Sequence, residues 1–524
     1  MNEDIIPGAS SFLFPDILPN QLTTHSPTVL YLYLQWVKAD YVFGGTETMR
    51  MAGERYLPQE DQETNVSYHR RLNRSTLFNA YKNAINTGSG RVFSKDICFE
   101  ASTGQGQDGS DSYEAAEKAV PPEIQNFAQD VDAQGRNATQ FAKAWFETGV
   151  NHGVSFLLVD ATRVAQEVVT KEDYVNAGAR PYWITIKATQ VHDVQTREVK
   201  GIQKLSLFRF AETVTEMSAD GISSVIHQQI RIYRLNDAGT GVDFAVYRCT
   251  GADTMKQWVN IDKGSLRGVT DIPIVPFYTD RVTFYLGKPP LQDLIDLNIH
   301  HWQVSSDYTN IQHITNVPFL FGKGLRAQMD DDGNAKQFVI SPYQSVMTDN
   351  AEATLEWVEH TGSSLDAARA YLERVETQME RVGLAMTTPT SSGNVTATEN
   401  ALNASESNSI LKSWAMSLQD SINMALTYTC QYLGVEDVTR AVINTDYAVD
   451  YTANDTFPDV LAMFTSNIID AETVVAEAKR RNVIDPAAEI VIPEPPPPPV
   501  IVQAAPGDLP GAPKTEAINT PAEA

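Results

Sequence analysis

The sequence is poor in cysteine and contains no long uncharged hydrophobic run. Its three cysteines, Cys98, Cys249 and Cys430, lie far apart and form no CxxC or Cys/His spacing, which disfavours both a zinc site and a disulfide framework. This usage fits synthesis in a reducing cytoplasm. No run reaches the roughly 18 apolar residues of a membrane helix, and the acidic N-terminus lacks a basic region followed by an apolar core. We therefore expect neither a membrane span nor secretion.

Basic residues are also scarce relative to acidic ones. There are 66 Asp and Glu against 40 Lys and Arg, so the formal net charge is −26. Summed over a surface, this charge repels nucleic acid and disfavours a protein that coats DNA. A hydrophobic content of 42% over 524 residues is enough to build several packed cores.

Motifs for catalysis are missing as well. No convergent Ser/His/Asp, Cys/His, paired-carboxylate or phosphate-loop pattern is present, and Ser155 is not part of a GxSxG elbow. We therefore expect no enzymatic activity and no cofactor. The run Asp330, Asp331 and Asp332 has the chemistry to hold a cation, which leaves a metal-dependent hydrolase as an alternative. The tip of an exposed hairpin explains these three aspartates more simply.

The first half of the chain has the pattern of one α+β body. Helical spacing, with glycine and proline at the ends, predicts helices over residues 26–44, 46–58, 68–87 and 137–153. The third is expected to break at Gly88 and Gly90. Alternating short runs between Arg180 and Tyr285 predict an antiparallel sheet. Residues 1–25 and 101–122 have the composition of a loose arm and a flexible surface loop.

A long helix then begins after Pro289 and Pro290 and has no breaker up to Ile314. Polar residues interrupt its apolar face, so we expect it to contact other copies or domains. A β unit with strands from Val317 onward and a second helix with an apolar stripe from Ser363 follow. The remaining patterns are a small polar stretch at 386–397, a long helix ending at Leu433, a helical pair and a proline-rich tail from about residue 489.

Three consecutive stretches of this region resemble the portal proteins of tailed bacteriophages, in particular a portal-like family described as a phage domain of unknown function. They are PPLQDLIDLN (289–298), HHWQVSSDYTN (300–310) and NVPFLFGKG (316–324). Trp36, Asp40 and YLP (56–58) are spaced as at the start of that family. RPYW (180–183) and IPIVPFY (272–278) also match its strands, so ordered short matches run from about residue 30 to residue 488.

The resemblance implies an α+β portal fold with a wing, a stem of two long helices, a clip and a crown. The implied parts are a flexible N-terminal arm (1–25), a wing body (26–286), a first stem helix (287–314), a clip (315–360), a second stem helix (361–385), a tunnel loop (386–397), a wing helix and strand (398–454), a helical crown (455–488) and a disordered tail (489–524).

The resemblance also implies a function in the virion. About twelve copies form a ring at one capsid vertex, through which double-stranded DNA passes during packaging and ejection without being recognised by sequence. The implied partners are the terminase large subunit, the capsid or scaffolding protein and a head-to-tail adaptor. Asp293, Asp296 and Asp307 are candidates for channel charge. The tunnel loop would contribute Thr387, Thr388, Thr390, Ser391, Ser392 and Asn394, and the clip tip Asp330 to Asp332. Another virion protein, an adaptor or minor capsid protein, is the alternative.

Overall fold

The structure is a computed structural model of the chain, and the fold divides into two compact units, residues 1–447 and 448–524. It describes residues 19–105, 111–113, 120–162, 179–218, 220–251, 257–266, 268–315, 319–324, 350–358, 363–383, 397–436, 439–445, 447, 453–466 and 468–480. Helices and antiparallel strands largely form separate runs along the first unit, which is the α+β arrangement that the sequence predicts.

Helices form most of the N-terminal part of the first unit. They are α1 (Pro19–Thr23), α2 (Pro27–Gly44), α3 (Thr46–Ala52), the short 3-10 helix η1 (Gly53–Arg55), α4 (Asn65–Arg74), α5 (Ala80–Val92), α6 (Pro122–Gln129) and α7 (Ala138–His152). Local chemistry sets several of the ends. The Asn137 side chain accepts the Gln140 N–H at the start of α7, and Gly153 ends the same helix in the left-handed conformation.

Two antiparallel sheets carry the body. The first has the order β10 (Ile274–Tyr278), β3 (Val154–Ala161), β4 (Pro181–Lys187). The second has the order β5 (Val191–Val199), β6 (Ile202–Met217), β7 (Ser224–Leu235), β8 (Val242–Thr250), β9 (Gln257–Ser265), with a 3-10 turn, η3 (Ala188–Gln190), before β5. Every residue of β3 except Ala161 is buried, because its sheet lies between helices and the second sheet's core residues.

Two of the predicted element boundaries were wrong. Gly88 and Gly90 do not end a helix but lie inside α5, where Gly88 and Ser89 are buried against the body. The chain breaks earlier, between Ser75 and Asn79, and the Asn79 side chain caps the new helix by accepting the Lys82 N–H. The second predicted helix is also shorter than expected, because Gly53 adopts a positive φ of 54°.

Two segments predicted to be loose contain ordered structure. Part of the predicted surface loop forms β1 (Cys98–Gln105) and β2 (Asp111–Tyr113), and β1 pairs with the distant β15 (Thr439–Val442). The end of the predicted N-terminal arm forms α1, whose Leu22 is buried. The residues after α1 are held by a hydrogen bond from Arg209 Nη2 to the Thr24 carbonyl, 2.8 Å long. Tertiary contacts, which local composition does not reveal, order both segments.

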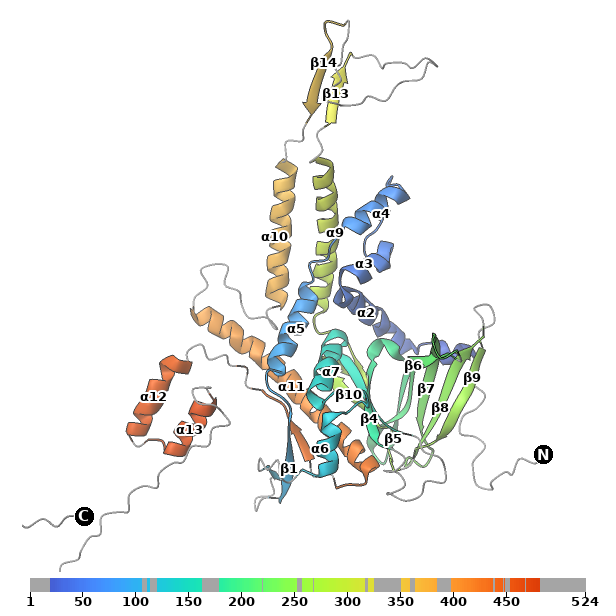
Figure 1. Cartoon of the computed structure of the whole chain (residues 1–524), viewed down its shortest axis with the longest axis vertical. Helices are drawn as coiled ribbons and strands as arrows, with labels where there is room; N and C mark the ends of the chain where they lie inside the picture. Colours follow the sequence, from blue (N-terminus) through green and yellow to red (C-terminus); the bar gives the residue numbers. More distant parts are fainter. Residues whose placement is uncertain are drawn as a thin grey trace, which may run out of the picture. The chain divides into compact units, whose positions relative to one another are not determined.

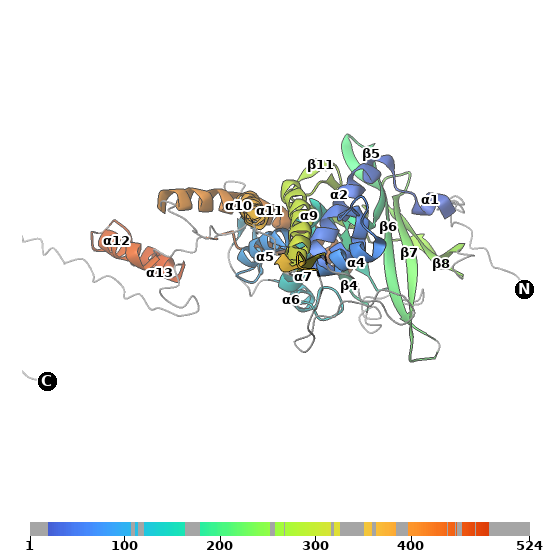
Figure 2. The same ribbon diagram turned by 90° about the horizontal axis from the view of Figure 1, so that it is seen from above.

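The long helix predicted near residue 290 is α9 (Gln292–Thr315), entered through the hairpin of β11 (Arg281–Thr283) and β12 (Leu286–Gly287). It is followed by β13 (Phe319–Lys323), β14 (Thr354–Val358), α10 (Ser363–Gly383) and α11 (Ala397–Leu433). Strands β13 and β14 pair antiparallel at the joined ends of α9 and α10, which lie side by side (Figure 1). Figure 2 looks from above this helix pair and shows α2 and α4 beside α9.

The second unit contains two described helices, α12 (Ala453–Thr465) and α13 (Ala471–Arg480), which pack on each other. The sequence predicts this helical pair. Asp470 caps α13 by accepting the Thr473 N–H at 2.8 Å. A search of the described residues finds no helix that is long and apolar enough to cross a membrane.

Candidate functional site

Helices α9 and α10 form the candidate site, and their contact has an apolar core. Leu372, Val375 and Met379 of α10 are buried. Val375 and Met379 belong to the same cluster as Leu294 and Trp302 of α9. These α10 positions lie on the apolar stripe that the sequence predicts, whereas Val382, also assigned to that stripe, is exposed. The pair is therefore fixed to the body through one side of each helix.

The opposite side of α9 carries the three aspartates proposed as channel charges. Asp296 and Asp307 are eleven residues apart, about three helical turns, and Asp293 lies one turn before Asp296. The structure thus places all three on one side of α9. This helix contains no lysine or arginine from Gln292 to Thr315, so cations near this face come only from other elements.

The three aspartates differ in their surroundings. Asp293 is exposed. Asp296 forms an ion pair with Lys38 of α2. Asp307 lies 3.5 Å from the Arg71 guanidinium of α4. Burial raises the pKa of the Asp307 carboxyl, and the charge of Arg71 opposes that rise. The negative charge of this face is therefore partly compensated at two of the three positions.

The buried side of α9 is polar in places, and these polar groups bond within the same unit. Asn298 accepts the Tyr81 N–H at 3.0 Å and donates to the Phe78 carbonyl at 2.7 Å. Ser75 Oγ donates to Ser306 Oγ at 2.8 Å. Both contacts hold the chain between α4 and α5 against α9. Asn298 and Ser306, two polar residues among the apolar positions of α9, thus position this segment within the same unit.

Arg71 is the charged centre of the contact between α4 and α9. Its side chain is 3% exposed and its Nη2 lies 2.8 Å from Glu63 Oε2. The same nitrogen donates to the Pro58 carbonyl at 2.8 Å. The hydrogen bond from Arg71 holds the pKa of Glu63 below its usual value. Because the charge is paired and its donors are used, Arg71 orders residues 58–71 beside the outer half of α9.

Two consecutive histidines of α9 reach α10. His301 Nε2 lies 3.0 Å from Glu376 Oε1, and His300 Nε2 lies 2.9 Å from the Tyr371 hydroxyl. His301 is buried while His300 is exposed. These contacts add directional polar links to the apolar packing of the two helices.

The N-terminal motif residues Trp36 and Asp40 tie α2 to its neighbours, Trp36 at the base of α9 and Asp40 at the end of α7. Trp36 Nε1 donates to the Gly287 carbonyl, just before α9, at 3.0 Å. Asp40 pairs with His152 at 2.8 Å and accepts a hydrogen bond from Asn151 at 2.7 Å. Burial opposes ionisation of Asp40, but hydrogen bonds from His152 and Thr189 and the charge of Lys187 hold its pKa below the usual value. Both residues act as structural ties between α2 and its neighbours.

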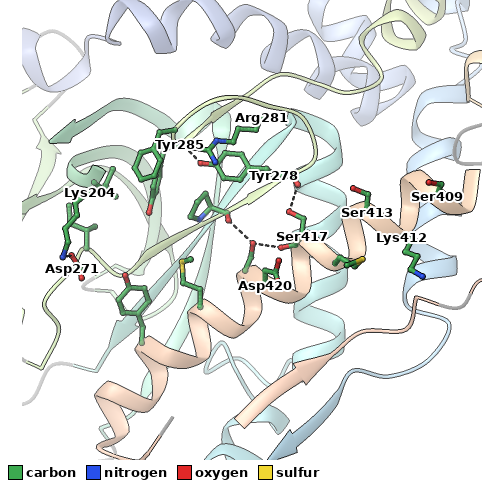
Figure 3. A pocket seen from close by; sticks show the side chains of 18 residues that line it. Lys204, Asp271, Tyr278, Arg281, Tyr285, Ser409, Lys412, Ser413, Ser417 and Asp420 are labelled. Carbon is green, nitrogen blue, oxygen red and sulfur yellow. Dashed lines mark hydrogen bonds and ion pairs between the residues drawn. The ribbon is translucent and has the colours of Figure 1, made fainter. Parts of the chain in front are cut away.

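A surface groove that the sequence did not reveal runs along α11 (Figure 3). Its volume is about 810 Å3. Its walls come from β6, the β10–β11 segment and one side of α11, and include Tyr278, Phe284, Tyr285, Met416, Met424 and Tyr428. The polar rim includes Arg281, Lys412 and the ion pair between Lys204 and Asp271, 2.6 Å apart. Such a groove depends on segments about 200 residues apart, so no local pattern predicts it.

Hydrogen bonds fix α11 beside the edge strand β10, and Figure 3 shows two of them. Ser417 Oγ donates to the Tyr278 carbonyl at 2.9 Å and Ser421 Oγ to the Pro276 carbonyl at 3.0 Å. Trp414 Nε1 donates to the Thr279 carbonyl at 3.0 Å. These bonds satisfy carbonyls that an edge strand would otherwise expose. The wall of the groove is therefore rigidly held.

The remaining nine predicted site residues fall in ranges that the structure does not describe. The tunnel-loop candidates Thr387, Thr388, Thr390, Ser391, Ser392 and Asn394 lie outside the described residues, as do Asp330, Asp331 and Asp332. Within the described ranges, no group of three or more His, Cys, Asp or Glu side chains is arranged to hold a metal ion.

Comparison with known families gives a match to part of the chain. A family model described as "Domain of unknown function (DUF4055)" matches residues 290–433, less than a third of the chain. The matched range begins just before α9 and ends with α11, so it contains the helix pair, the β13–β14 hairpin and one wall of the groove. No curated protein matches the chain.

Proposed function

We propose that this chain is the portal subunit of a tailed bacteriophage. About twelve copies form a closed ring at one capsid vertex, and double-stranded DNA passes through the ring during packaging and ejection. The observation that carries this proposal is the order helix, β hairpin, helix in α9, β13, β14 and α10, built out from an α+β body. It agrees with the stem and clip that the sequence resemblance implies.

The charge of α9 supports a passive channel. A channel that DNA slides through must hold phosphates weakly, since each lysine or arginine contact adds affinity by releasing counterions. The exposed side of α9 carries Asp293, Asp296 and Asp307, and the cations paired with this face among the described residues are Lys38 and Arg71 from adjacent helices. An acidic face of this kind would repel the DNA backbone and keep it mobile.

The proposed partners follow from this role. The terminase large subunit would dock at the end of the stem formed by the β13–β14 hairpin, and the capsid or scaffolding protein and a head-to-tail adaptor would contact the body. The proposed location is the portal vertex of the virion, with synthesis in the cytoplasm of the host bacterium.

The mass of the purified, untagged protein tests the proposal. We expect native mass spectrometry to give roughly twelve copies of the 57.9 kDa chain, and negative-stain images of the same fraction to show a ring with a central hole. A protein that stays monomeric at every salt and protein concentration would contradict the proposal and favour an adaptor or minor capsid role.

A further inference from the structure

The segment around α1 covers the outer face of the five-stranded sheet. On β7, Ile230 and Ile232 point away from the body core, because they alternate with Tyr233, which belongs to that core. The two isoleucines are 1% and 3% exposed, and the described side chain that covers them from outside the sheet is Leu22 of α1. Figure 2 shows α1 beside this sheet. Residues 19–26, which we call the strap, thus cover an apolar patch of the sheet.

Hydrogen bonds to its backbone hold the strap on strands β5 and β6. The Ser26 N–H donates to the His192 carbonyl at 2.8 Å, and His192 Nδ1 lies 3.0 Å from the Thr23 carbonyl. Arg209 Nη2 donates to the Thr24 carbonyl at 2.8 Å. Since a carbonyl oxygen only accepts, Nδ1 of His192 carries the proton in this contact. Two basic side chains of the sheet therefore bind carbonyls of the strap.

His25 of the strap stacks on His192 of the sheet. The ring centroids are 4.4 Å apart and the ring planes differ by 12°. The Tyr33 ring of α2 also lies 4.4 Å from His25. The Nε2 atom of His25 is buried and has no hydrogen-bond partner among the described residues. A neutral ring can leave Nε2 unprotonated there, whereas a protonated ring would bury a charge and an unpaired N–H.

The groups around the stacked pair oppose its protonation. Burial lowers the pKa of His25, and the charge of Arg209 lowers it further. Burial, then the charges of His25 and Arg209, lower the pKa of His192 to about 4, although the hydrogen bond from its Nδ1 raises it. Asp193 of β5 is the carboxylate partner of Arg209, at 3.9 Å. The described elements thus bring Tyr33 from α2, Asp193 from β5 and Arg209 from β6 against the two histidines.

We propose that the strap leaves the sheet when His25 and His192 are protonated, so that it acts as a pH-dependent cover of the apolar patch beneath it. With both rings protonated, two like charges would stack on each other beside Arg209, and Asp193 would be the single carboxylate facing three cations. In the released strap the imidazoles are in water, where nothing opposes protonation. Acid therefore favours release, which uncovers Ile230 and Ile232. This inference does not depend on the proposed ring.

Linkage gives the direction and the size of the effect. A histidine whose pKa is lower in the docked state than in the released state stabilises docking above its released value, which is about 6.5. This contribution is lost as the pH falls towards the docked value, which for His192 is about 4. The ratio of docked to released strap should therefore fall about tenfold per pH unit below 6.5, and roughly a hundredfold between pH 6.5 and pH 4.5.

The reactivity of a thiol placed under the strap measures release. Leu22→Cys places the thiol on the strap and Ile230→Cys places it on the sheet, and both positions are 1% exposed. In each chain, exposed Cys98 is the reference for thiol chemistry and buried Cys430 reports global unfolding. The chains are labelled with a pyridyl disulfide at pH 7.5 to pH 4.5, and peptide mass spectrometry measures the rate at each thiol.

We expect the labelling rate of the new thiol, divided by that of Cys98, to rise roughly a hundredfold between pH 6.5 and pH 4.5 while Cys430 stays protected. A ratio that does not change with pH in either chain would overturn the proposal. A ratio that rises only together with the labelling of Cys430 would overturn it as well, because acid would then unfold the whole unit.

Variants of the histidines test whether this pair is the cause, each in the Leu22→Cys chain. The double variant His25→Phe, His192→Asn keeps an aromatic ring and a hydrogen-bond donor but has no group that titrates, so its ratio should be independent of pH. His25→Lys places a permanent cation in the stack and should release the strap at pH 7.5. The matched control His69→Lys, at an exposed position of α4, should leave the ratio unchanged. A double variant that keeps the wild-type pH profile, or equal ratios in the two lysine variants, would overturn the proposal.

Discussion

The imidazole of His301 on α9 lies 3.0 Å from the carboxylate of Glu376 on α10, measured from Nε2 to Oε1. The histidine is 3% exposed, so the carboxylate supplies the polar partner that water would otherwise provide. Because α9 and α10 are joined only through the hairpin segment, this link and the apolar contacts near it determine how the two helices pair.

Glu376→Leu should weaken that pairing. The change leaves a buried ring nitrogen without its acceptor, which costs about 1–3 kcal/mol in the free energy of unfolding. Glu380→Leu on the exposed side of the same helix is the matched control and should change the stability by less than about 0.5 kcal/mol. Denaturant unfolding monitored by circular dichroism measures both, and equal losses in the two variants would contradict a specific role for Glu376.

Asn298→Leu should destabilise the base of α9. The variant removes the acceptor of the buried Tyr81 N–H and one of the two donors to the Phe78 carbonyl, which keeps the Ala80 N–H, so one buried backbone group is left unpaired. We expect the free energy of unfolding to fall by about 1–3 kcal/mol. Gln312→Leu makes the same kind of change at an exposed position of α9 and should be nearly neutral. Thermal unfolding of the two variants side by side distinguishes these outcomes, and an unchanged melting temperature for Asn298→Leu would count against the network.

Gly153→Ala should disrupt the joint between α7 and α9. Gly153 has a φ of +82°, and a Cβ there would lie 1.7 Å from the Lys288 carbonyl oxygen. Gly135 has a φ of +90°, but nothing lies within 4 Å of its Cβ position. Gly135→Ala therefore has the same backbone strain, about 1 kcal/mol, without the clash. We expect the free energy of unfolding to fall by several kcal/mol more in Gly153→Ala than in Gly135→Ala. Equal unfolding midpoints for the two variants would show that the chain around Lys288 moves to make room for the new Cβ.

Asp132 should make the free energy of unfolding depend on pH. Burial opposes its ionisation, but hydrogen bonds from Arg136 and from the Gln134 N–H hold the pKa of Asp132 below its usual value. A depressed pKa contributes stability above the unfolded pKa of about 3.9, and this contribution disappears as the pH falls through the folded pKa. The difference in free energy of unfolding between the wild type and Asp132→Asn should therefore be largest at pH 7 and become smaller below about pH 4. Unfolding curves of both proteins from pH 7 to pH 3 test this, and a loss independent of pH would contradict it.

The charge on α9 should control DNA binding by the assembled ring. Asp293→Lys changes an exposed carboxylate into a cation on the proposed channel face, and each added phosphate contact steepens the salt dependence of binding by about 0.9 in slope. Asp237→Lys makes the same charge change at the turn after β7, where the side chain is 93% exposed. Filter binding of duplex DNA at several salt concentrations should give tighter binding for Asp293→Lys than for Asp237→Lys. Equal affinities would argue against α9 as a channel wall.

The elements that the sequence predicted well are those whose signals are local. The α7 helix is bounded by the Asn137 cap and by Gly153, and the α10 stripe repeats at three and four residues. The alternating runs of the body became antiparallel strands in register. Caps, periodicity and turn residues act through neighbours a few positions away, so they can be read without the fold.

The errors arose where distant segments override local preference. Gly88 and Gly90 stay helical because α5 is packed against the body, and Ala101, the first residue of the predicted loop, lies in a strand because Thr439 of β15 pairs with it across more than 300 residues. The sequence names three aspartates of α9 as candidates for channel charge, but it does not reveal that Lys38 and Arg71 of other helices pair with two of them. The spacing of residues along a helix predicts which of them share a face. It gives no information on the elements that pack against that face.

The amino-acid sequence by itself determined the acidic charge, the α+β class and the position of the long helix pair, because these follow from composition and from short-range periodicity. Tertiary structure alone decided that Asn298 lies against Tyr81, 217 residues away, that Ser417 and Ser421 bind the edge of β10, and that a groove forms along α11. The physical reason is that burial and hydrogen-bond partners are properties of the packed chain, and packing brings together residues whose local sequences carry no record of each other.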